Sequence, residues 1–377
     1  MALKIGIVCS PTYGGSGVVA TELGRFLAAK GHEVHFISVA MPFRLETNAS
    51  SNIYFHEVQT LDYPVLPGDL AGIAIAGRTA QVVEDYQLDI IHAHYAIPHA
   101  ISAWLAREAT RHRGVKLVTT LHGTDITLVG RAPSVFPIAR FAIEESDAVT
   151  TVSEWLRQET IREFGIKTPI HVIPNFVDDA KFYRRPPCDV KKHYAPNGEK
   201  ILVHVSNFRP VKRIGDVVRV FARVRAEMSA KLLFIGDGPE RDQATRLARE
   251  LGVCNDVHFL GKQEKIETFF SCADVMLFPS EYESFGLAAL EAMCSENVVI
   301  ASNGGGLPEV INHGVDGFLA PVGDVETMAR HAIDILRNPV RAAEMGRTAR
   351  ANAIARFHVA NVVPLYERLY EEVLAKG

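Results

Sequence analysis

Short apolar runs rich in β-branched residues alternate along the whole chain with segments whose apolar residues recur every three or four positions. In the first half, the runs expected to form strands are KIGIVC, EVHFISV, IYFHEV, DIIHAH, KLVTTLH, AVTTVS and IHVIPN. The second half restarts the pattern with KILVHVSN, KLLFIGDG, VHFLG, DVMLFPS and VVIASN. Such alternation indicates parallel sheets that helices cover on both faces. We therefore predict an α/β protein with two doubly wound, Rossmann-like domains facing a cleft.

A polar segment without periodicity separates the two halves. It carries Pro186, Pro187 and Pro196, and proline interrupts helices and central strands. The C-terminal residues have a helical pattern with a break expected at Pro364. The expected organisation is a first domain over residues 1–175, a linker over 176–197 and a second domain over 198–355.

Composition places the chain among ordinary globular enzymes. Of 377 residues, 47% are hydrophobic and 22% charged, and the formal net charge of −4 argues against nucleic acid as a partner. The five cysteines are far apart and lack a C-x-x-C pair, which argues against a disulfide framework or a zinc site and fits a reducing cytoplasm. No apolar run approaches the roughly 18–20 residues of a membrane span. We expect a cytoplasmic protein without a membrane partner; a homo-oligomer stays open.

A glycine-rich loop, CSPTYGGSGVVATELG, follows the first strand run and leads into a helical pattern. Gly15, Gly17 and Ala20 match the spacing of a dinucleotide-binding fingerprint, which would indicate an NAD enzyme. That interpretation is disfavoured because five residues separate Cys9 from Gly15. The second strand run also lacks the expected carboxylate at its end, since none occurs before Glu46.

The same loop is nevertheless suited to an anionic ligand. Gly15, Ser16 and Gly17 would offer backbone amides and a hydroxyl group at a helix start, where unpaired N–H groups and the helix dipole stabilise negative charge. The alternative is a tight turn in which the glycines only supply a positive φ.

Charged residues also follow a strand run in the second half. Arg209 and Lys212 come after KILVHVSN, where a planar guanidinium and a compact ammonium group would neutralise a phosphate. Two basic residues on a loop are also compatible with ordinary solvated side chains.

The segment SEYESFGLAALEAM carries the most specific pattern. Ser284 is the expected N-cap of a helix, with Glu283 just outside its first turn. Glu291 follows among alanines and leucines, where a carboxylate is costly unless it is paired or binds a ligand such as a ribose diol. The alternative places Glu291 on an exposed face. The open N–H groups of the first turn would be those of Phe285, Gly286 and Leu287.

These features together resemble retaining, nucleotide-sugar-dependent glycosyltransferases of family 4, which have the GT-B fold. The motifs are the Arg209 and Lys212 pair, the two glutamates Glu283 and Glu291, and GGGLPEVI with the later GFL and GD. The resemblance spans nearly the full chain. It implies that the second domain binds the nucleotide sugar, that the first binds the acceptor, and that no metal or other cofactor is needed. It also implies that a final helix, roughly residues 356–377, crosses back onto the first domain.

Motifs of the first half narrow the resemblance further. PTYGGSGVVATELG, HAHYAIPHA, TTLHGTDIT and IPNFVD are similar to those of members that transfer N-acetylglucosamine from UDP-N-acetylglucosamine to the hydroxyl group of L-malate, the first step of bacillithiol biosynthesis. Transfer would retain the anomeric configuration through front-face attack. Another donor or acceptor within the family, an NAD-dependent oxidoreductase and a nucleotide-sugar-binding regulator without turnover stay as alternatives.

The resemblance assigns roles to particular residues. The catalytic candidates are Glu283, His122, Arg209 and Lys212. The candidates for binding the nucleotide sugar are Arg209, Lys212, Glu283, Ser284, Phe285, Gly286, Leu287, Glu291 and Gly15. The acceptor candidates are Ser16, Gly17, Arg44 (taken to lie at the end of the second strand), Tyr95, Thr120 and Asn175.

Overall fold

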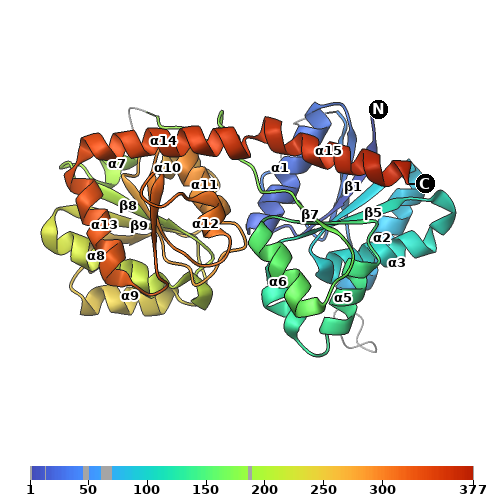
Figure 1. The fold of residues 1–377 in the computed structure, drawn as a ribbon, viewed down its shortest axis with the longest axis horizontal. Coiled ribbons are helices and arrows are strands. Elements are labelled where there is room, and N and C mark those ends of the chain that lie inside the picture. Colours follow the sequence, from blue (N-terminus) through green and yellow to red (C-terminus); the bar gives the residue numbers. More distant parts are fainter. Residues whose placement is uncertain (1, 13, 46–50, 61–69, 186–188, 377) are drawn as a thin grey trace. The chain divides into compact units, whose positions relative to one another are not determined.

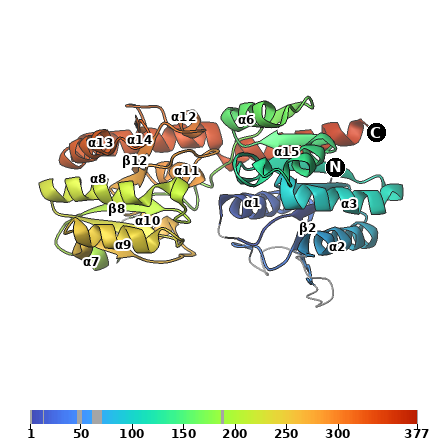
Figure 2. The same cartoon turned by 90° about the horizontal axis from the view of Figure 1, so that it is seen from below.

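The structure is a computed structural model that describes residues 2–12, 14–45, 51–60, 70–185 and 189–376. The chain forms two compact units, one of Met1–Asn175 with Val359–Gly377 and one of Phe176–His358. Each unit contains one parallel sheet with helices on both faces, as Figures 1 and 2 show. The predicted α/β class with two doubly wound parallel sheets is therefore confirmed.

The first unit is built on a seven-stranded sheet of order β3-β2-β1-β4-β5-β6-β7. Its strands coincide with the seven apolar runs of the first half and are β1 (Lys4–Val8), β2 (Glu33–Ser38), β3 (Ile53–Glu57), β4 (Ile90–His94), β5 (Lys116–Leu121), β6 (Ala148–Thr151) and β7 (Ile170–Val172). The order reverses between β1 and β4, which pair in parallel. The loops after these two neighbours therefore leave toward opposite faces, and the space between them is where ligands bind in such sheets.

Helices cover both faces of this sheet. They are α1 (Gly15–Ala29), α2 (Ala71–Tyr86), η1 (Ala96–Ala100), α3 (Ile101–Ala109), η2 (Arg111–Arg113), α4 (Thr124–Thr127), η3 (Val129–Arg131), α5 (Phe136–Glu144), α6 (Glu154–Phe164) and α15 (Val359–Ala375). α2 and α3 pack together on one face, where Val8, Ile91 and Leu117 belong to a buried apolar cluster. α1 and α15 contact each other, and α15 also contacts β5.

The second unit has a six-stranded sheet of order β10-β9-β8-β11-β12-β13. Its strands are β8 (Lys200–Val205), β9 (Ala230–Ile235), β10 (Val257–Phe259), β11 (Val275–Phe278), β12 (Val298–Ser302) and β13 (Gly317–Ala320). The order reverses between β8 and β11. β13 was not among the predicted strands, because GFLA is short and its first residue, Gly317, is also the last residue of the turn-like segment HGVDG.

The helices of the second unit also cover both faces of its sheet. They are α7 (Asp189–Tyr194), η4 (Pro210–Lys212), α8 (Ile214–Glu227), α9 (Arg241–Glu250), η5 (Cys254–Asp256), α10 (Glu267–Phe270), α11 (Leu287–Cys294), α12 (Leu307–Val310), α13 (Val325–Arg337) and α14 (Pro339–Phe357). α8 packs against α9 and α13, whereas α11 packs against α10 and α14.

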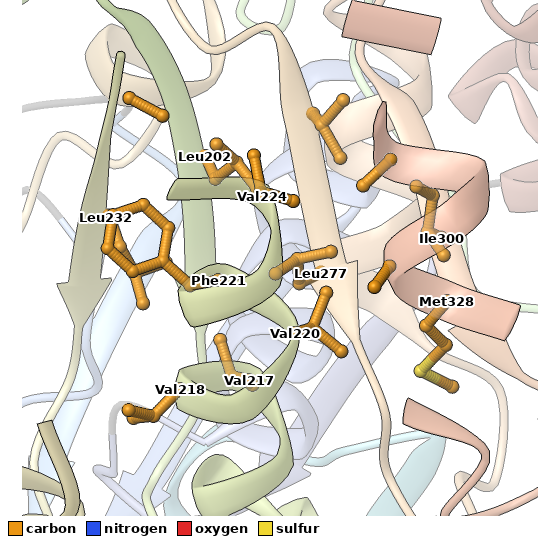
Figure 3. Close-up of a cluster of buried hydrophobic side chains, with 14 of the residues drawn as sticks. Leu202, Val217, Val218, Val220, Phe221, Val224, Leu232, Leu277, Ile300 and Met328 are labelled. Atoms are coloured by element: carbon orange, nitrogen blue, oxygen red, sulfur yellow. The ribbon is translucent and has the colours of Figure 1, made fainter. Parts of the chain in front are cut away.

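One face of this sheet supplies the large apolar core that Figure 3 shows. Strand residues two positions apart point to the same face, so β8 presents one side chain to the core, β11 and β12 two each and β9 three. α8 places its apolar residues at the three- and four-residue spacing of one helix face. The labelled members of the cluster are Leu202, Val217, Val218, Val220, Phe221, Val224, Leu232, Leu277, Ile300 and Met328.

Residues 176–197, predicted to form a linker, belong to the second unit instead. The side chains of Phe176 and Phe182 are buried, and Arg350 of α14 donates a hydrogen bond to the carbonyl oxygen of Phe182 (2.6 Å). The polar composition of this segment led to the wrong prediction of a linker. A few buried aromatic side chains are enough to pack a mostly polar segment against a domain. Pro186 and Pro187, two of the prolines used to locate this segment, lie outside the described residues.

The C-terminal helical segment is interrupted at a different residue from the one predicted. Pro364 lies inside α15, and the break is at His358, whose ψ of 141° ends α14. Residues from Val359 belong to the first unit, whereas 356–358 belong to the second. The buried tyrosines Tyr366 and Tyr370 pack α15 into the first unit.

Cys272 is disulfide-bonded, whereas Cys9, Cys254 and Cys294 are free, so the chain has a disulfide although the cysteine spacing argued against a disulfide framework. Among the described residues, none of the helices has both the length and the apolar character that crossing a membrane requires.

The core of the second unit gives a matched stability test. Val218 is completely buried in α8, whereas Val340 near the start of α14 is 67% exposed. Val218→Ala should lower the free energy of unfolding by about 2 kcal/mol through lost burial and a residual cavity. Val340→Ala should change it by less than about 0.5 kcal/mol. Denaturant unfolding followed by circular dichroism measures both, and equal losses would contradict the packing described.

Candidate active site

Three charged residues predicted to bind the donor lie in the second unit where its strand order reverses. The loop after β8 carries Arg209 and Lys212, and the loop after β11 carries Glu283. β8 and β11 are neighbours in the sheet, and the N–H of Glu281 donates to the carbonyl oxygen of Val211 (2.8 Å). Residues far apart in sequence therefore meet at the carboxyl ends of two adjacent strands, the usual ligand position in a doubly wound sheet.

Lys212 and Glu283 form the central ion pair of this site. Lys212 Nζ donates to Glu283 Oε1 (2.6 Å), and Ser280 Oγ donates to the same oxygen (2.7 Å). Both charged side chains are mostly buried, with 18% and 12% of their surface exposed. Oε2 of Glu283 makes no hydrogen bond to the described residues, and Lys212 Nζ has further N–H groups. The pair can thus accept one hydrogen bond and donate others to a ligand.

Arg209 provides a second cation on the loop that carries Lys212. It precedes η4, and its carbonyl oxygen accepts the N–H of Lys212 (2.8 Å). Its side chain is exposed, and within the described ranges it makes no ion pair. The prediction that Arg209 and Lys212 lie on one loop at a strand end is confirmed, while their contact with a diphosphate stays a prediction.

The helix after Glu283 begins later than the sequence predicts. α11 starts at Leu287 with Gly286 as its N-cap, so Ser284 is not the cap. Gly286 has a φ of 96°, and a Cβ there would lie 2.6 Å from Leu307 Cδ2, so glycine is required. Phe285 is buried against Phe357 (5.3 Å between ring centroids). The open N–H groups of the helix start are therefore those of Leu287 and the two residues after it.

Glu291 is buried, with 4% of its surface exposed, in the second turn of α11. The alternative that it lies on an exposed outer face is therefore wrong. Its neighbours Leu290 and Ala292 are fully buried as well. The apolar neighbours in the sequence therefore predicted the burial of Glu291 correctly. Its contact with a ribose stays a prediction.

A glycine loop holds Glu283 in place from the side of β12. Gly305 and Glu283 form a parallel bridge, and the N–H of Gly306 donates to the carbonyl oxygen of Glu283 (2.7 Å). A Cβ at Gly304 would lie 2.1 Å from the carbonyl oxygen of Glu281. The first two glycines of GGGLPEV, Gly304 and Gly305, are thus required by the close approach of the two loops.

His204 of β8 lies inside the sheet and links β8 to β11. It was not identified from the sequence. Its Nδ1 is 2.9 Å from the carbonyl oxygen of Leu277 in β11, and its Nε2 is 2.8 Å from Ser206 Oγ. Burial lowers its pKa to about 4, with a smaller effect from the charge of Lys212. A neutral histidine thus ties together the two strands whose loops carry the ion pair. The local sequence HVSN, residues 204–207, does not indicate that its histidine links two strands.

In the first unit, the glycine loop after β1 leads directly into α1, as predicted. Gly14, Gly15 and Gly17 all have negative φ, so the alternative that these glycines supply a positive φ is wrong. Gly17 is needed because a Cβ there would lie 2.6 Å from the carbonyl oxygen of Thr12. Gly15 is exposed and Ser16 is buried at the N-terminus of this 15-residue helix. The open amides are present, and their ligand stays a prediction.

Tyr95 and His122 lie after the neighbouring strands β4 and β5. Tyr95 has a φ of 88° and a ψ of 139°, a backbone conformation that costs a tyrosine free energy. Its N–H donates to the carbonyl oxygen of Thr120 (2.9 Å), and its ring packs edge-on against His122 (5.3 Å). His122 is partly exposed. The structure therefore brings these two predicted residues together at the carboxyl edge of the sheet.

Thr120 lies at the end of β5 as predicted, but its side chain is buried, and Arg44 does not lie at the end of β2. Thr120 is fully buried, and its hydroxyl group hydrogen-bonds His92 Nε2 and Thr150 Oγ1 (both 2.7 Å), so it serves the interior of the unit rather than an acceptor. Arg44 lies six residues after β2 ends, not at the strand end. Its side chain is 7% exposed, and Nη1 of its guanidinium is 3.9 Å from a carboxylate oxygen of Glu22 in α1.

Asn175 and Asp125 are buried polar residues of this unit. Asn175, a predicted acceptor residue, is 6% exposed, and its Oδ1 lacks a hydrogen-bond partner within the described part of the chain. Asp125, which sequence reasoning missed, accepts the N–H groups of Ala96 and Gly123 (both 2.9 Å) and of His122 (3.3 Å). Burial raises its pKa to about 6. Asp125 therefore fixes the loops of Tyr95 and His122 relative to each other.

The predicted donor residues, except Gly15, thus lie together in the second unit, and the acceptor residues lie in the first. In the part of the chain that the structure describes, no group of three or more histidine, cysteine, aspartate or glutamate residues could hold a metal ion.

Comparisons with known proteins cover both units. The family model described as Glycosyltransferase Family 4 matches residues 13–181, and that described as Glycosyl transferases group 1 matches residues 188–352. The chain is 46% identical to the N-acetyl-alpha-D-glucosaminyl L-malate synthase of Bacillus anthracis, over 99% of this chain and 98% of the relative. It is 27% identical to a GDP-mannose-dependent phosphatidylinositol monomannoside mannosyltransferase of Mycolicibacterium smegmatis, over 73% of this chain and 74% of that protein.

Solved structures share the fold at lower identity. Sucrose-phosphate synthase from Thermosynechococcus elongatus superposes with a TM-score of 0.84 at 22% identity, over the whole of both chains. Anabaena HepE in complex with UDP and glucose superposes with a TM-score of 0.83 at 21% identity, over 98% of this chain and 99% of that chain.

The close approach of the two loops around Glu283 can be tested with matched glycines. Gly305 (φ 70°) would place a Cβ 2.2 Å from the carbonyl oxygen of Glu283, whereas Gly314 (φ 77°) has open space around it. Gly314→Ala should cost about 1–2 kcal/mol of unfolding free energy from backbone strain alone. Gly305→Ala should cost clearly more, because the backbone of the Glu283 loop must also move. Equal costs in denaturant unfolding would contradict this account.

Proposed function

Because the chain belongs to glycosyltransferase family 4, we propose that it transfers N-acetylglucosamine from UDP-N-acetylglucosamine to the hydroxyl group of L-malate. The observation that carries the proposal is the 46% identity to a malate synthase over 99% of this chain and 98% of that relative. The other relative compared is named for a different donor and acceptor and is only 27% identical. A transfer with another donor or acceptor is therefore the second candidate.

The second unit is suited to the donor. Arg209 and the remaining N–H groups of Lys212 would neutralise the diphosphate, and the open amides at the start of α11 would add hydrogen bonds. Oε2 of Glu283 is available to accept a hydrogen bond from a sugar hydroxyl group. The buried carboxylate of Glu291 would hold the ribose diol.

The first unit is suited to a small dianion. Malate carries two carboxylates, and the start of α1 offers the amides of Gly15, Ser16 and Gly17 with the hydroxyl group of Ser16. Asn175 and the loop of Tyr95 are the further candidates for contact with the acceptor. His122 would hydrogen-bond a hydroxyl group of the donor sugar.

Charge stabilisation explains how these residues would promote a retaining transfer. The bond between the anomeric carbon and the diphosphate oxygen breaks as the malate oxygen attacks from the same face, and the malate proton passes to the departing oxygen. Negative charge then grows on the UDP leaving group, where Arg209, Lys212 and the start of α11 stabilise it. No protein nucleophile is required.

Three further properties complete the proposal. The reaction needs no metal, because the cations and amides of the second unit would take over the neutralisation of the diphosphate. Both substrates are water-soluble, which suits the predicted cytoplasmic location. An NAD-dependent oxidoreductase is disfavoured, since no acidic residue follows directly after β2.

A donor-by-acceptor panel tests the proposed substrates. UDP-N-acetylglucosamine, UDP-glucose and GDP-mannose are each combined with L-malate, glycerol 3-phosphate and inositol phosphate, with and without EDTA. Release of nucleoside diphosphate and product mass are measured, and the anomer is assigned by NMR. We expect by far the fastest transfer for UDP-N-acetylglucosamine with L-malate, unaffected by EDTA, giving the α-anomer. A faster pair that excludes malate would contradict the proposal.

The role of Lys212 can be separated from the loss of an ion pair. Lys212→Ala should reduce kcat about 10²–10³-fold, because it removes positive charge from the leaving group. Lys231→Ala is the matched control, since Lys231 makes an equally short ion pair with Asp256 (2.6 Å) and is 19% exposed, against 18% for Lys212. The control should keep kcat within about twofold. A near-wild-type rate for Lys212→Ala would refute the role assigned to this lysine.

A further inference from the structure

His94 lies directly behind His122 and touches it through a ring nitrogen. His94 Nδ1 is 2.9 Å from His122 Nε2, and the two rings are nearly parallel, with an angle of 20° between their planes. His94, the last residue of β4, is 1% exposed, whereas His122 is partly exposed after β5. His94 therefore cannot reach a substrate in this conformation, but it contacts a residue that can.

Two neutral imidazoles in contact restrict each other's protonation. Burial lowers the pKa of His122 to about 3, and burial together with the nearby histidines lowers the pKa of His94 well below its usual value. Each ring then has one N–H donor and one acceptor nitrogen. The contact between Nδ1 of His94 and Nε2 of His122 requires that one of the two donates, so the tautomers of both rings are coupled.

Either His94 or His122 donates in this contact, and the other ring nitrogen of His94 decides which. Nε2 of His94 is buried and has no hydrogen-bond partner among the described residues. If His122 donated, this nitrogen of His94 would carry a buried N–H without an acceptor, which is rare in proteins. If His94 donates, the nitrogen is an unprotonated acceptor, and unsatisfied acceptors are less rare.

We propose that His94 is a positioning residue that donates from Nδ1 to His122 and thereby keeps His122 in the tautomer protonated at Nδ1. His122 then faces the reaction with a fixed N–H donor, suited to the oxygen of a sugar hydroxyl group. This inference rests on the proposed function, in which His122 contacts the donor sugar.

The surroundings of His94 hold the donor ring in place. His99 Nδ1 hydrogen-bonds the backbone carbonyl oxygen of His94, and the ring of His92 stacks on that of His94 (4.4 Å between centroids). His92 is itself fixed through Thr120 Oγ1 and Tyr370 OH (both 2.7 Å). Asp125 accepts the backbone N–H of His122, which holds the loop of the other partner. The backbones of both residues are thus held in place, and the stacked ring of His92 packs against the ring of His94.

The tautomer can be read directly, without substrate. In protein labelled with ¹⁵N-histidine, two-bond proton–nitrogen correlation spectra distinguish a ring protonated at Nδ1 from one protonated at Nε2, and His122→Asn identifies the signals of His122. We expect wild-type His122 to be protonated at Nδ1. Protonation at Nε2 in the wild-type protein would overturn the inference.

Two substitutions at His94 test the effect on catalysis. His94→Asn keeps an N–H donor at the same distance along the side chain as Nδ1, whereas His94→Leu removes the donor. We expect His94→Leu to shift His122 toward the Nε2–H form and to lower kcat about 10–100-fold, the size expected for one lost hydrogen bond in the transition state, with an unchanged KM for malate. His94→Asn should restore kcat to within about threefold of wild type and keep the Nδ1–H signal.

A matched control separates positioning from packing. His56 is 5% exposed in the same unit and contacts another histidine, His35, through a ring nitrogen at 2.9 Å. His56→Leu should lower the thermal midpoint about as much as His94→Leu while leaving kcat unchanged. Equal losses of kcat in the Leu and Asn variants of His94, with equal thermal midpoints, would overturn the positioning role.

The same measurements distinguish failure of this inference from failure of the proposed function. A wild-type enzyme that transfers no sugar to malate contradicts the proposed function alone, because the tautomer is measured without substrate. An Nε2–H signal in an enzyme that does transfer sugar to malate overturns the inference alone. If His94→Leu does not fold, the wild-type tautomer and His94→Asn still decide the question.

Discussion

The parallel pairing of β8 with β11 is the constraint on which the candidate donor site depends. These strands are neighbours in the sheet, yet Lys212 and Glu283 lie 71 residues apart in the chain. The apolar core on one face of the sheet fixes the strands, and the loops at their carboxyl ends inherit that position. A charged pair held in this way loses little conformational entropy when a ligand binds, because its geometry is established by folding.

Two histidines inside the sheets are neutral, whereas three residues at the strand ends of the candidate donor site are charged. Inside the sheets, His92 and His204 are kept neutral by burial and use both ring nitrogens in hydrogen bonds. At the strand ends, Lys212 and Glu283 remain partly exposed as an ion pair, and Arg209 is exposed beside them. These two neutral histidines thus connect the strands at low desolvation cost, whereas the three charged residues at the strand ends lie where solvent or a ligand can compensate their charge.

Much of this arrangement follows from local sequence patterns. β-Branched runs identified every strand of the first unit, and the apolar neighbours of Glu291 indicated its burial. Ser284 was wrongly taken as a helix cap because the backbone has a positive φ at Gly286, close to Leu307, so that the helix begins only at Leu287. Local propensity carries no information about that contact.

The polar residues of the first unit show a second limit. Thr120 was assigned to the acceptor because it lies near a strand end, but its hydroxyl group is used by His92 and Thr150 on neighbouring strands. Asp125 and His94 lie in motifs that were identified in the sequence but were assigned no role, because their roles depend on partners brought together by strand order. Whether a polar side chain serves the interior or a ligand is decided by its cross-strand neighbours, which an isolated segment does not reveal.

The return of α15 to the first unit has a consequence for how the chain is made. Tyr366 and Tyr370 complete the interior of a unit whose other residues end at Asn175. During translation, the ribosome therefore releases the entire second unit before the first receives its last helix. Until then, the polar interior around His92 and Thr120 lacks the tyrosines that cover it. A nascent chain of this protein must carry an unfinished N-terminal unit for more than 180 residues of synthesis, a period in which chaperones would find exposed surface to bind.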